Sequence, residues 1–343
     1  MQKKAILVGF FSTIGDIESL DLVKGWLDAE GWSYDVAPYS EKIRRGLDGA
    51  ADIRNVDPKD YTHFVVICGP CHRRVFGTYG INIRDFEHCV KVGVNLTMVD
   101  PLEEWNPFDV LIERDSDRTA RPDVSLLCDT PTVPVVGVCF IDQQPEYGDR
   151  QRHAEARRAI DGLIARRGLA AVEIDTRWPR ERNGGRLGSP EEVYSLMART
   201  DVVITNRLHG TVFALKAGTP PLVIDAVNGG DKVSAQAAVL GWPACVSVEE
   251  ATPDRLDSLL DWCLSEEAVQ FVPETMRRQR GALTSYREGV LRSLELEEGS
   301  VPVPTSTLVE LPTDGSPARM RYVASRAVRE VESLLQRLKR SLR

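Results

Sequence analysis

The stretch Thr205-Asn206-Arg207-Leu208-His209-Gly210-Thr211-Val212-Phe213-Ala214-Leu215 decides the fold of this chain. It follows a short apolar run, Asp201-Val202-Val203-Ile204, which is typical of a buried strand. Apolar residues then recur at helical spacing as far as Ala217-Gly218, where the glycine predicts the end of a helix. Residues 221–225 read as another strand. The sequence therefore predicts a strand, a helix and a second strand, with an arginine and a histidine where the helix begins.

The start of this helix is suited to an anion. The first turn of a helix presents free N–H groups and the positive end of the helix dipole. Arg207 can hold a carboxylate or phosphate with two hydrogen bonds. Histidine titrates near neutral pH, and a positive dipole end disfavours an imidazolium at His209 unless an anion lies beside it. We expect a bound anion here; the alternative is that Arg207 and His209 are buried and hold loops together.

Strands alternate with helices on both sides of this stretch. Further strands are predicted at residues 4–11, 33–37, 63–67, 92–99, 108–112, 135–140 and 172–174. Helices are predicted from Gly15-Asp16 and over residues 149–167. This alternation predicts parallel, doubly wound sheets, whose ligands bind at the carboxyl ends of the strands. Asp16 therefore has two interpretations, a cap of the first helix or a residue of the site.

The chain is too long, at 343 residues, for a single core. Prolines at 122, 131 and 134 interrupt the alternation and predict a domain boundary. We predict an α/β fold of two doubly wound Rossmann-like domains that face a cleft, plus a C-terminal helix. The predicted segments are a first domain over 1–130, a second over 131–294, a linker over 295–317 and the helix over 318–343.

The predicted C-terminal helix is basic and amphipathic. Residues 318–343 contain eight Lys and Arg against two Glu, a net charge of +6. Three interpretations stay open: packing on the protein's own body or on a second copy of the chain, contact with an anionic membrane surface, or binding to a groove on a partner.

Composition excludes several classes of function. A net charge of −8 argues against a general nucleic-acid binder, because phosphate contacts need clustered Lys and Arg. No apolar run approaches the ~18 residues that span a bilayer, so the chain is not expected to be transmembrane. Seven cysteines, several of them in apolar runs, indicate buried thiols in a reducing compartment. We expect a cytoplasmic protein.

Cys68-Gly69-Pro70-Cys71-His72 carries two short motifs that favour other functions. The tetrapeptide occurs in thioredoxin active sites, and Cys-x-x-Cys-His is the attachment pattern of c-type haem. The thioredoxin context expects a tryptophan before the first cysteine, where this chain has Ile67. The loop otherwise places three potential cations, His72, Arg73 and Arg74, at the end of a strand, where they suit an anion or are solvated at the surface.

Three segments together resemble the polysaccharide pyruvyl transferase family. The most specific is Thr-Asn-Arg-Leu-His-Gly at 205–210, with Phe-Ala-Leu-Lys-Ala-Gly-Thr-Pro after it and Asp231-Lys232-Val233 further on. Ser12-Thr13-Ile14-Gly15-Asp16 is similar to the family's Asn-x-Gly-Asp segment, and Arg114-Asp115-Ser116 to its Arg-Asp-x-x-Ser region. The three are in family order and cover roughly residues 5 to 245. The Cys-Gly-Pro-Cys loop departs from the glycine-rich turn that many members have there.

The resemblance implies a GT-B-like pair of domains and transfer of pyruvate from phosphoenolpyruvate onto two hydroxyls of a sugar or glycan. The acceptor would be free or linked to a lipid or a nucleotide, and the first domain would be the acceptor side. His209 is the expected acid/base, with His72 second. Donor contacts are expected from Arg207, Leu208, Gly210, Lys232 and Arg114, and a cleft loop from Asp16, Arg73 and Arg74.

No metal and no cofactor besides the phosphoenolpyruvate donor are expected, because no carboxylate cluster suggests a metal. Other expectations are a second copy of the chain and a peripheral membrane as partners. A glycosyltransferase that uses a nucleotide sugar is the alternative enzyme, because the fold and the anion-gripping loop would be shared. A sugar- or anion-binding protein without catalysis is the third interpretation.

Overall fold

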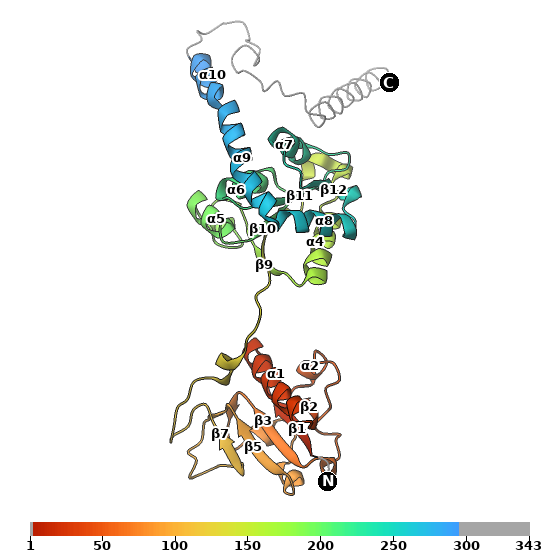
Figure 1. Cartoon of the computed structure of the whole chain (residues 1–343), viewed down its shortest axis with the longest axis vertical. Helices are drawn as coiled ribbons and strands as arrows, with labels where there is room; N and C mark the ends of the chain where they lie inside the picture. The colour runs from red at the N-terminus through yellow and green to blue at the C-terminus, as the bar shows by residue number, and fades with distance from the viewer. Residues whose placement is uncertain (1–2, 295–343) are drawn as a thin grey trace. The chain divides into compact units, whose positions relative to one another are not determined.

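The structure is a computed structural model that describes residues 3–294 (Figure 1). It divides into two compact units, Met1–Pro131 and Thr132–Arg343, and each is described here by itself. The boundary predicted between residues 130 and 131 lies one residue before this division. The predicted linker over 295–317 and the predicted helix over 318–343 lie outside the described residues.

The first unit is built on a five-stranded parallel sheet in the order β2-β1-β3-β5-β7. Its strands are β1 (Lys4–Gly9), β2 (Ser33–Pro38), β3 (His63–Ile67), β5 (Val90–Val94) and β7 (Val110–Ile112), and a short parallel pair joins β4 (Pro70–Cys71) to β6 (Thr97–Met98). Its helices are α1 (Ile14–Ala29), α2 (Glu41–Arg44), α3 (Val75–Thr78) and the 3₁₀ turns η1 (Pro58–Asp60), η2 (Ile83–Phe86) and η3 (Val124–Leu127).

Both faces of this sheet are covered by apolar side chains. Leu20 and Val23 of α1 pack with Leu7 and Ile67 on one face. Ile6 and Val66 neighbour these residues along the same strands and therefore point to the other face. There they pack with Phe76 of α3 and Phe86 of η2. Because successive residues of a strand point to opposite faces and both faces are covered, these strands are apolar throughout.

The second unit repeats the architecture in the order β12-β11-β10-β8-β9, again all parallel. Its strands are β8 (Val135–Cys139), β9 (Ala170–Glu173), β10 (Val202–Thr205), β11 (Pro221–Asp225) and β12 (Cys245–Ser247). Its helices are α4 (His153–Arg167), α5 (Pro190–Met197), α6 (Leu208–Ala217), α7 (Lys232–Leu240), α8 (Pro253–Cys263), α9 (Glu266–Ala282) and α10 (Thr284–Leu294), with 3₁₀ turns η4 (Pro145–Arg150), η5 (Arg180–Arg182) and η6 (Val248–Glu250).

Helices cover both faces of the second sheet. Ile160 of α4 and Leu260 of α8 pack with Val138 and Ile204 on one face. Met197 of α5 and Ala214 of α6 pack with the neighbouring residues Cys139 and Val203, which point to the other face. The predicted fold class, α/β with two doubly wound Rossmann-like domains, is confirmed.

The strand order places a ligand crevice at a defined point of each sheet. In each unit, the strand that comes second along the chain lies on one side of the first strand, and the third strand lies on the other side. The connections that follow the first and second strands therefore run in opposite directions across the sheet. Ligands of such sheets bind at the carboxyl ends of the strands at this switch point. In the second unit the point lies between β8 and β10, and β10 leads directly into Arg207.

Two predicted elements differ from the observed ones. The strand predicted over 92–99 is interrupted at Asn95, which has a φ of 54°. Asparagine tolerates this left-handed conformation, and the turn separates β5 from β6. The helix predicted over 149–167 begins only at His153, because residues 145–150 form the η4 turn, which is kinked at Gly148 with a φ of 50°.

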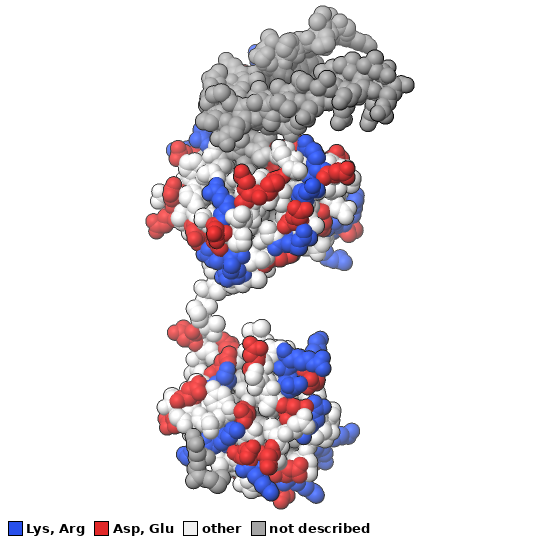
Figure 2. All heavy atoms as spheres, turned by 90° about the vertical axis from the view of Figure 1, so that its right-hand side faces the viewer, with Lys and Arg blue, Asp and Glu red and all other residues white. Residues whose placement is uncertain are grey.

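One face of the molecule is mixed in charge, and the described helices include no candidate membrane span. On the face of the molecule in Figure 2, acidic and basic side chains are interspersed over both units. A nucleic-acid binder would present clustered basic residues instead. Within residues 3–294, no helix combines the length and the apolar character needed to cross a bilayer.

Candidate functional site

The loop from β10 to α6 is held by three residues of the sequence motif. The Thr205 hydroxyl donates to the Cys139 carbonyl at 2.7 Å and accepts from the Arg207 N–H at 3.0 Å. The Asn206 side chain accepts from the Ile141 N–H at 2.8 Å and donates to the Ile141 carbonyl at 2.9 Å. These bonds join the ends of β8 and β10 across the switch point.

The third of these residues, Gly210, is required by close packing. A Cβ atom at this position would lie 2.2 Å from the Thr205 hydroxyl oxygen and 3.1 Å from the Cys139 sulfur. The helix can therefore begin this close to the strand ends only with glycine here. The helix end predicted at Gly218 is confirmed, because Gly218 ends α6 with a φ of 87°.

Gly210→Ala is expected to lower the free energy of unfolding of the second unit by about 1–3 kcal/mol, because the added methyl group overpacks this contact. Urea denaturation would measure it. The matched control is Gly162→Ala in α4, where a Cβ meets nothing within 4 Å, and where a gain of up to about 1 kcal/mol is expected. Equal behaviour of the two variants would contradict the close approach.

The side chains of Arg207 and His209 remain available for a ligand. Arg207 is the N-cap residue of α6 and is half-buried, and within residues 3–294 its guanidinium has no hydrogen-bond or ion-pair partner. Burial raises the pKa of the Cys139 thiol, at the end of β8, to about 11, and the positive charge of Arg207 opposes this shift. His209 is exposed in the first turn of α6, and its ring lies 5.6 Å from that of Phe213. Leu208 instead packs against the core.

Lys232, an expected donor contact, is the first residue of α7, after the loop that follows the neighbouring strand β11. Its ammonium lies 4.0 Å from a carboxylate oxygen of Glu146 and 5.5 Å from the ring centre of Tyr147. The loop before it is fixed by the buried Asp225 carboxylate, which accepts from the N–H groups of Asp231 at 2.8 Å and Ser234 at 2.9 Å. Lys232 therefore projects from an ordered turn at the carboxyl edge of the sheet.

In the first unit, the loop after β4 is already neutralised in part. Arg73 pairs with Asp100 at 3.0 Å and Glu104 at 2.7 Å. Arg74 is exposed, and its backbone N–H donates to Nδ1 of the half-buried His72 at 3.2 Å. The predicted cation loop thus forms, but acidic residues about 30 positions later in the chain engage one of its arginines.

The Cys-Gly-Pro-Cys motif lacks the exposed thiol of a thioredoxin-type site. Cys68 and Cys71 are both buried, and all seven cysteines of the chain are free. Burial raises the pKa of Cys71 to about 12, whereas a reactive cysteine needs a lowered pKa. Cys68 instead accepts a hydrogen bond from Asn95 at 3.1 Å.

Arg114 is also engaged within its own unit. It pairs with Asp115 and with Asp123, both at 2.9 Å, and it donates to Thr97. Ser116 donates to Glu113 at 3.2 Å. In this structure the Arg-Asp-Ser segment therefore joins β7 to the segment that follows it.

Glu113, which precedes this segment, is a buried acid with two arginine partners. Its side chain has no exposed surface and accepts from Arg118 at 2.7 Å and Arg121 at 3.0 Å. The hydrogen bond from Arg118, with smaller contributions from Arg121 and Ser116, lowers the pKa of Glu113 to about 2 despite burial. Its contribution to stability is therefore present above the usual glutamate pKa and is lost as the pH falls towards 2.

Glu113→Gln is expected to lower the free energy of unfolding of the first unit by about 1–2 kcal/mol at pH 7, a value kept small because both arginines are half-exposed. The difference between the melting curves of wild type and variant should be constant above the usual glutamate pKa and should shrink as the pH is lowered from there towards 2. A difference that did not shrink would contradict the role of the Glu113 charge.

Asp16 acts as a helix cap. Its carboxylate accepts from the N–H groups of Ser12 at 3.0 Å and Thr13 at 3.1 Å, and the Thr13 hydroxyl accepts from the Asp16 N–H at 3.2 Å. This reciprocal pair is a capping box. Of the two interpretations of Asp16, the structure contains the capping one.

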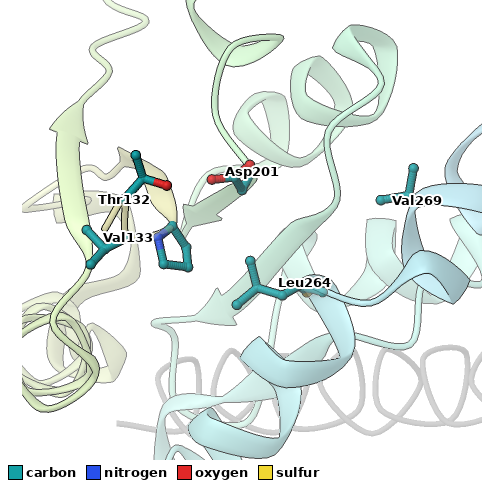
Figure 3. A pocket seen from close by; sticks show the side chains of 7 residues that line it. Thr132, Val133, Asp201, Leu264 and Val269 are labelled. Carbon is teal, nitrogen blue, oxygen red and sulfur yellow. The ribbon is translucent and has the colours of Figure 1, made fainter. Parts of the chain in front are cut away.

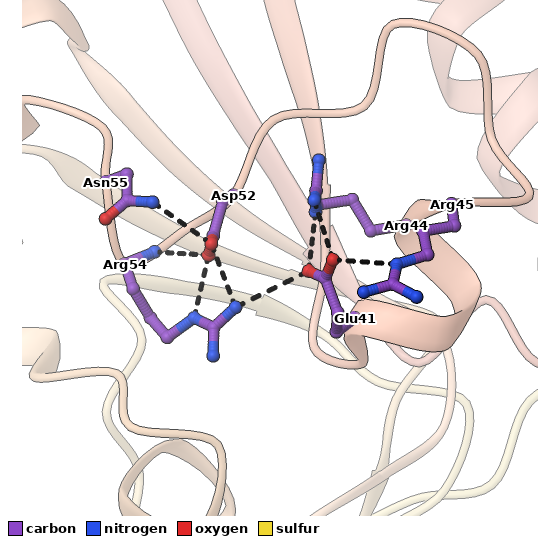
Figure 4. Close-up of polar contacts among 6 residues, drawn as sticks. All are labelled: Glu41, Arg44, Arg45, Asp52, Arg54 and Asn55. Carbon is purple, nitrogen blue, oxygen red and sulfur yellow. Dashed lines mark hydrogen bonds and ion pairs between the residues drawn. The ribbon is translucent and has the colours of Figure 1, made fainter.

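A second arginine cluster lies after β2 and is likewise internally paired (Figure 4). Glu41 binds Arg44 at 2.7 Å and Arg45 at 3.1 Å, and Asp52 binds Arg54 at 2.8 Å. The hydrogen bonds from Arg44 are the main cause that lowers the pKa of Glu41 to about 2. These arginines are paired with acidic side chains of the same cluster, which leaves little positive charge for a ligand.

Sequence reasoning missed a cavity beside α6. It has a volume of about 350 Å³ and is lined by residues 176–178, 183, 187–190, 193 and 213. Because its walls come from the loop after β9, from α5 and from α6, no single motif marks it. Sequence reasoning also gave no role to His153, which is buried at the start of α4 with Nδ1 unpartnered among the described residues.

Another hollow, of about 420 Å³, lies at the opposite end of this sheet (Figure 3). Thr132, Val133 and Pro134 line it just before β8, and Asp201 just before β10. These are the amino ends of the strands, whereas ligands of such sheets bind at the carboxyl ends. We assign it no part in the candidate site.

Residues 123–226 match the family model described as polysaccharide pyruvyl transferase. The matched segment runs through β11 and includes Arg207, Leu208, His209 and Gly210. The resemblance predicted from the sequence is confirmed over these residues, and it supports a pyruvyl transferase role. The other two motifs, at Ser12–Asp16 and Arg114–Ser116, lie outside the matched segment, at residues 12–16 and 114–116.

No curated protein matches the chain significantly. Among solved structures, a spinosyn rhamnosyltransferase is 14% identical, covers 86% of this chain and 100% of its own, and has a TM-score of 0.31. An E. coli ADP-heptose lipopolysaccharide heptosyltransferase II is 14% identical, covers 78% of this chain and 99% of its own, and has a TM-score of 0.28. A UDP-GlcNAc 2-epimerase from Methanocaldococcus jannaschii is 9% identical over 78% and 94%, with a TM-score of 0.28. Values this low say nothing about the reaction of this chain.

Proposed function

We propose that this protein transfers pyruvate from phosphoenolpyruvate onto two hydroxyl groups of a sugar or glycan and releases phosphate. The observation that carries the proposal is the guanidinium of Arg207 at the start of α6, which has no partner within residues 3–294 and lies inside the segment that the family model matches. Arg73 and Arg114, by contrast, are bound to acids of their own unit. A half-buried arginine without an acid partner, next to free helix N–H groups, is suited to a carboxylate or phosphate.

The reaction makes two carbon–oxygen bonds to one carbon and breaks one. The methylene carbon of phosphoenolpyruvate takes up a proton and becomes a methyl group, which leaves positive charge on the neighbouring carbon. One sugar hydroxyl attacks that carbon. The second hydroxyl then displaces the phosphate, so that the two hydroxyl protons end on the methyl group and on the departing hydrogen phosphate. The product is a cyclic ketal, and no oxidant or further reactant is needed.

Roles for the site residues follow from these demands. Arg207 and the first N–H groups of α6 would bind the donor anion and stabilise the departing phosphate. His209, exposed in the same turn, would exchange protons with the methylene carbon or with the sugar hydroxyl. Lys232 is a further donor contact at the edge of the neighbouring strand. The free cysteines suit a reducing compartment, which supports a cytoplasmic location.

Calorimetry tests the donor without knowledge of the acceptor. Wild-type protein would be titrated with phosphoenolpyruvate and, in parallel, with nucleotide sugars. We expect phosphoenolpyruvate to bind, and phosphate to be released when a panel of methyl glycosides is added. Binding of a nucleotide sugar alone would replace the proposal by a glycosyltransferase, and donor binding without phosphate release on any acceptor would favour a binding protein.

A further inference from the structure

We propose that the cavity beside α6 binds a sugar ring of the acceptor and selects a ring with an apolar substituent, such as the methyl group of a 6-deoxy or N-acetylated sugar. The inference deepens the proposed function and rests on it, because attack by a sugar hydroxyl at His209 requires the acceptor to lie near that residue. Every residue of the cavity belongs to the second unit, so this inference departs from the expectation that the first domain is the acceptor side.

The cavity adjoins the reacting end of α6. Phe213 forms part of its wall and lies four residues after His209, on the same face of the helix. The two rings are 5.6 Å apart. A ring that fills the cavity against Phe213 therefore lies next to the imidazole that the proposed reaction uses.

The wall opposite α6 is an ordered loop. The Asp175 carboxylate accepts from the N–H groups of Arg177 at 2.9 Å and Gly184 at 2.8 Å. The Asn183 amide donates to the carbonyls of Asp175 and Arg177, and its oxygen accepts from the N–H groups of Gly185 and Leu187. These bonds shape the cavity before any ligand enters, which reduces the cost of ordering it on binding.

The composition of the wall decides what it can hold. Leu187, Pro190, Val193 and Phe213 are apolar, and Trp178 is 75% exposed, as a stacking platform for a ring would be. Phosphoenolpyruvate is a compact anion with no apolar face to match these side chains, so the cavity is suited to the other substrate.

Two polar side chains of the wall, Asn183 and Ser189, are engaged by the protein, and the exposed Arg177 guanidinium is paired along one edge. The Asn183 amide is engaged by the loop itself, Arg177 is paired with Asp175 at 2.7 Å, and Ser189 caps α5. Among the described residues, the Thr176 hydroxyl is the buried side-chain group of this wall without a partner. A fully hydroxylated ring would therefore lose hydrogen bonds to water on entry, whereas a methyl group would not.

Saturation-transfer NMR with defined sugars tests this assignment. The probes are methyl 6-deoxyglucoside against methyl glucoside, and N-acetylglucosamine against glucosamine, with uridine as a nucleoside competitor. We expect each methyl-bearing probe to bind about 10-fold or more tightly than its partner, with its methyl protons receiving the strongest saturation. Equal affinities within each pair, or displacement of the sugars by uridine, would overturn the proposal.

Two variants locate the binding. Trp178→Ala removes an exposed side chain and is expected to weaken the methyl-bearing probes about 10-fold, while Val193→Phe fills the cavity and should abolish their binding. Trp26→Ala in α1, also exposed at 47%, is the matched control and should change nothing. Unchanged affinity in both cavity variants would place the sugar elsewhere and refute the inference.

The same variants separate this inference from the proposed function. Trp178→Ala should bind phosphoenolpyruvate as the wild type does, because the donor is assigned to Arg207. If phosphoenolpyruvate fails to bind the wild type while the methyl-bearing sugars bind and depend on Trp178, the proposed reaction is wrong and the cavity assignment stands. If phosphoenolpyruvate binds but neither cavity variant changes the affinity for the sugars, the cavity assignment is wrong and the proposed reaction stands.

Discussion

Arg207→Ala is expected to lower the affinity for phosphoenolpyruvate by about 10²–10³-fold. Two charge-assisted hydrogen bonds from Arg207 to the ligand would contribute about 1.5–3 kcal/mol each. The half-buried guanidinium has no protein partner among residues 3–294, so the substitution removes contacts to the ligand only. Calorimetric titration of the purified variant would measure the change. The fold should persist, because the motif residues that hold the loop are Thr205, Asn206 and Gly210.

Two further variants make the Arg207 result specific. Arg207→Lys keeps the charge but loses the bidentate fork, so an intermediate affinity is expected. Arg166→Ala in α4 removes an arginine that pairs with Asp257 at 3.0 Å, and it should bind phosphoenolpyruvate normally. Wild-type affinity in Arg207→Ala would remove the observation on which the proposed function depends.

His209→Gln is expected to lower kcat for phosphate release by about 10²–10⁴-fold while the affinity for phosphoenolpyruvate changes little. Glutamine fills a similar volume and keeps hydrogen-bonding capacity, but it cannot exchange a proton as a general acid or base. The imidazole is exposed and accepts no hydrogen bond from the described residues, so the substitution should leave the stability of the protein unchanged. Phosphate release with the most active methyl glycoside would measure kcat.

His72→Gln is the companion variant, because His72 was the second histidine expected in the role. Its Nδ1 already accepts from the Arg74 N–H, and we expect kcat to fall far less than in His209→Gln. A large loss in His72→Gln with near-normal activity in His209→Gln would reverse the assignment of the acid/base.

Local sequence patterns predicted the elements that carry the site. The strand before Thr205 and the helix stop at Gly218 lie where the periodicity and the glycines indicate. Such signals act over a few residues, so a single segment contains all the information they need.

Contacts between distant segments could not be predicted in this way. Arg73 and Arg114 suit an anion as well as Arg207 does by residue type, and only the fold brings Asp100 and Asp123 to them. The turn at Asn95 is similar, because its side chain is held by Cys68 and Asp123 from other parts of the chain. The cavity beside α6 has walls from three segments, so no spacing in the sequence describes it.

The division of work within the Thr-Asn-Arg-Leu-His-Gly segment has a consequence for sorting related chains. Thr205 and Asn206 bind the backbone of neighbouring segments, and Gly210 packs closely on the Thr205 and Cys139 side chains. The side chains of Arg207 and His209 have no such role among the described residues. If the proposed function holds, a homologue that retains the first three and has lost the last two would keep the scaffold and would not catalyse pyruvyl transfer. Genome-scale assignment of this reaction should therefore weigh the arginine and the histidine separately from the overall motif score.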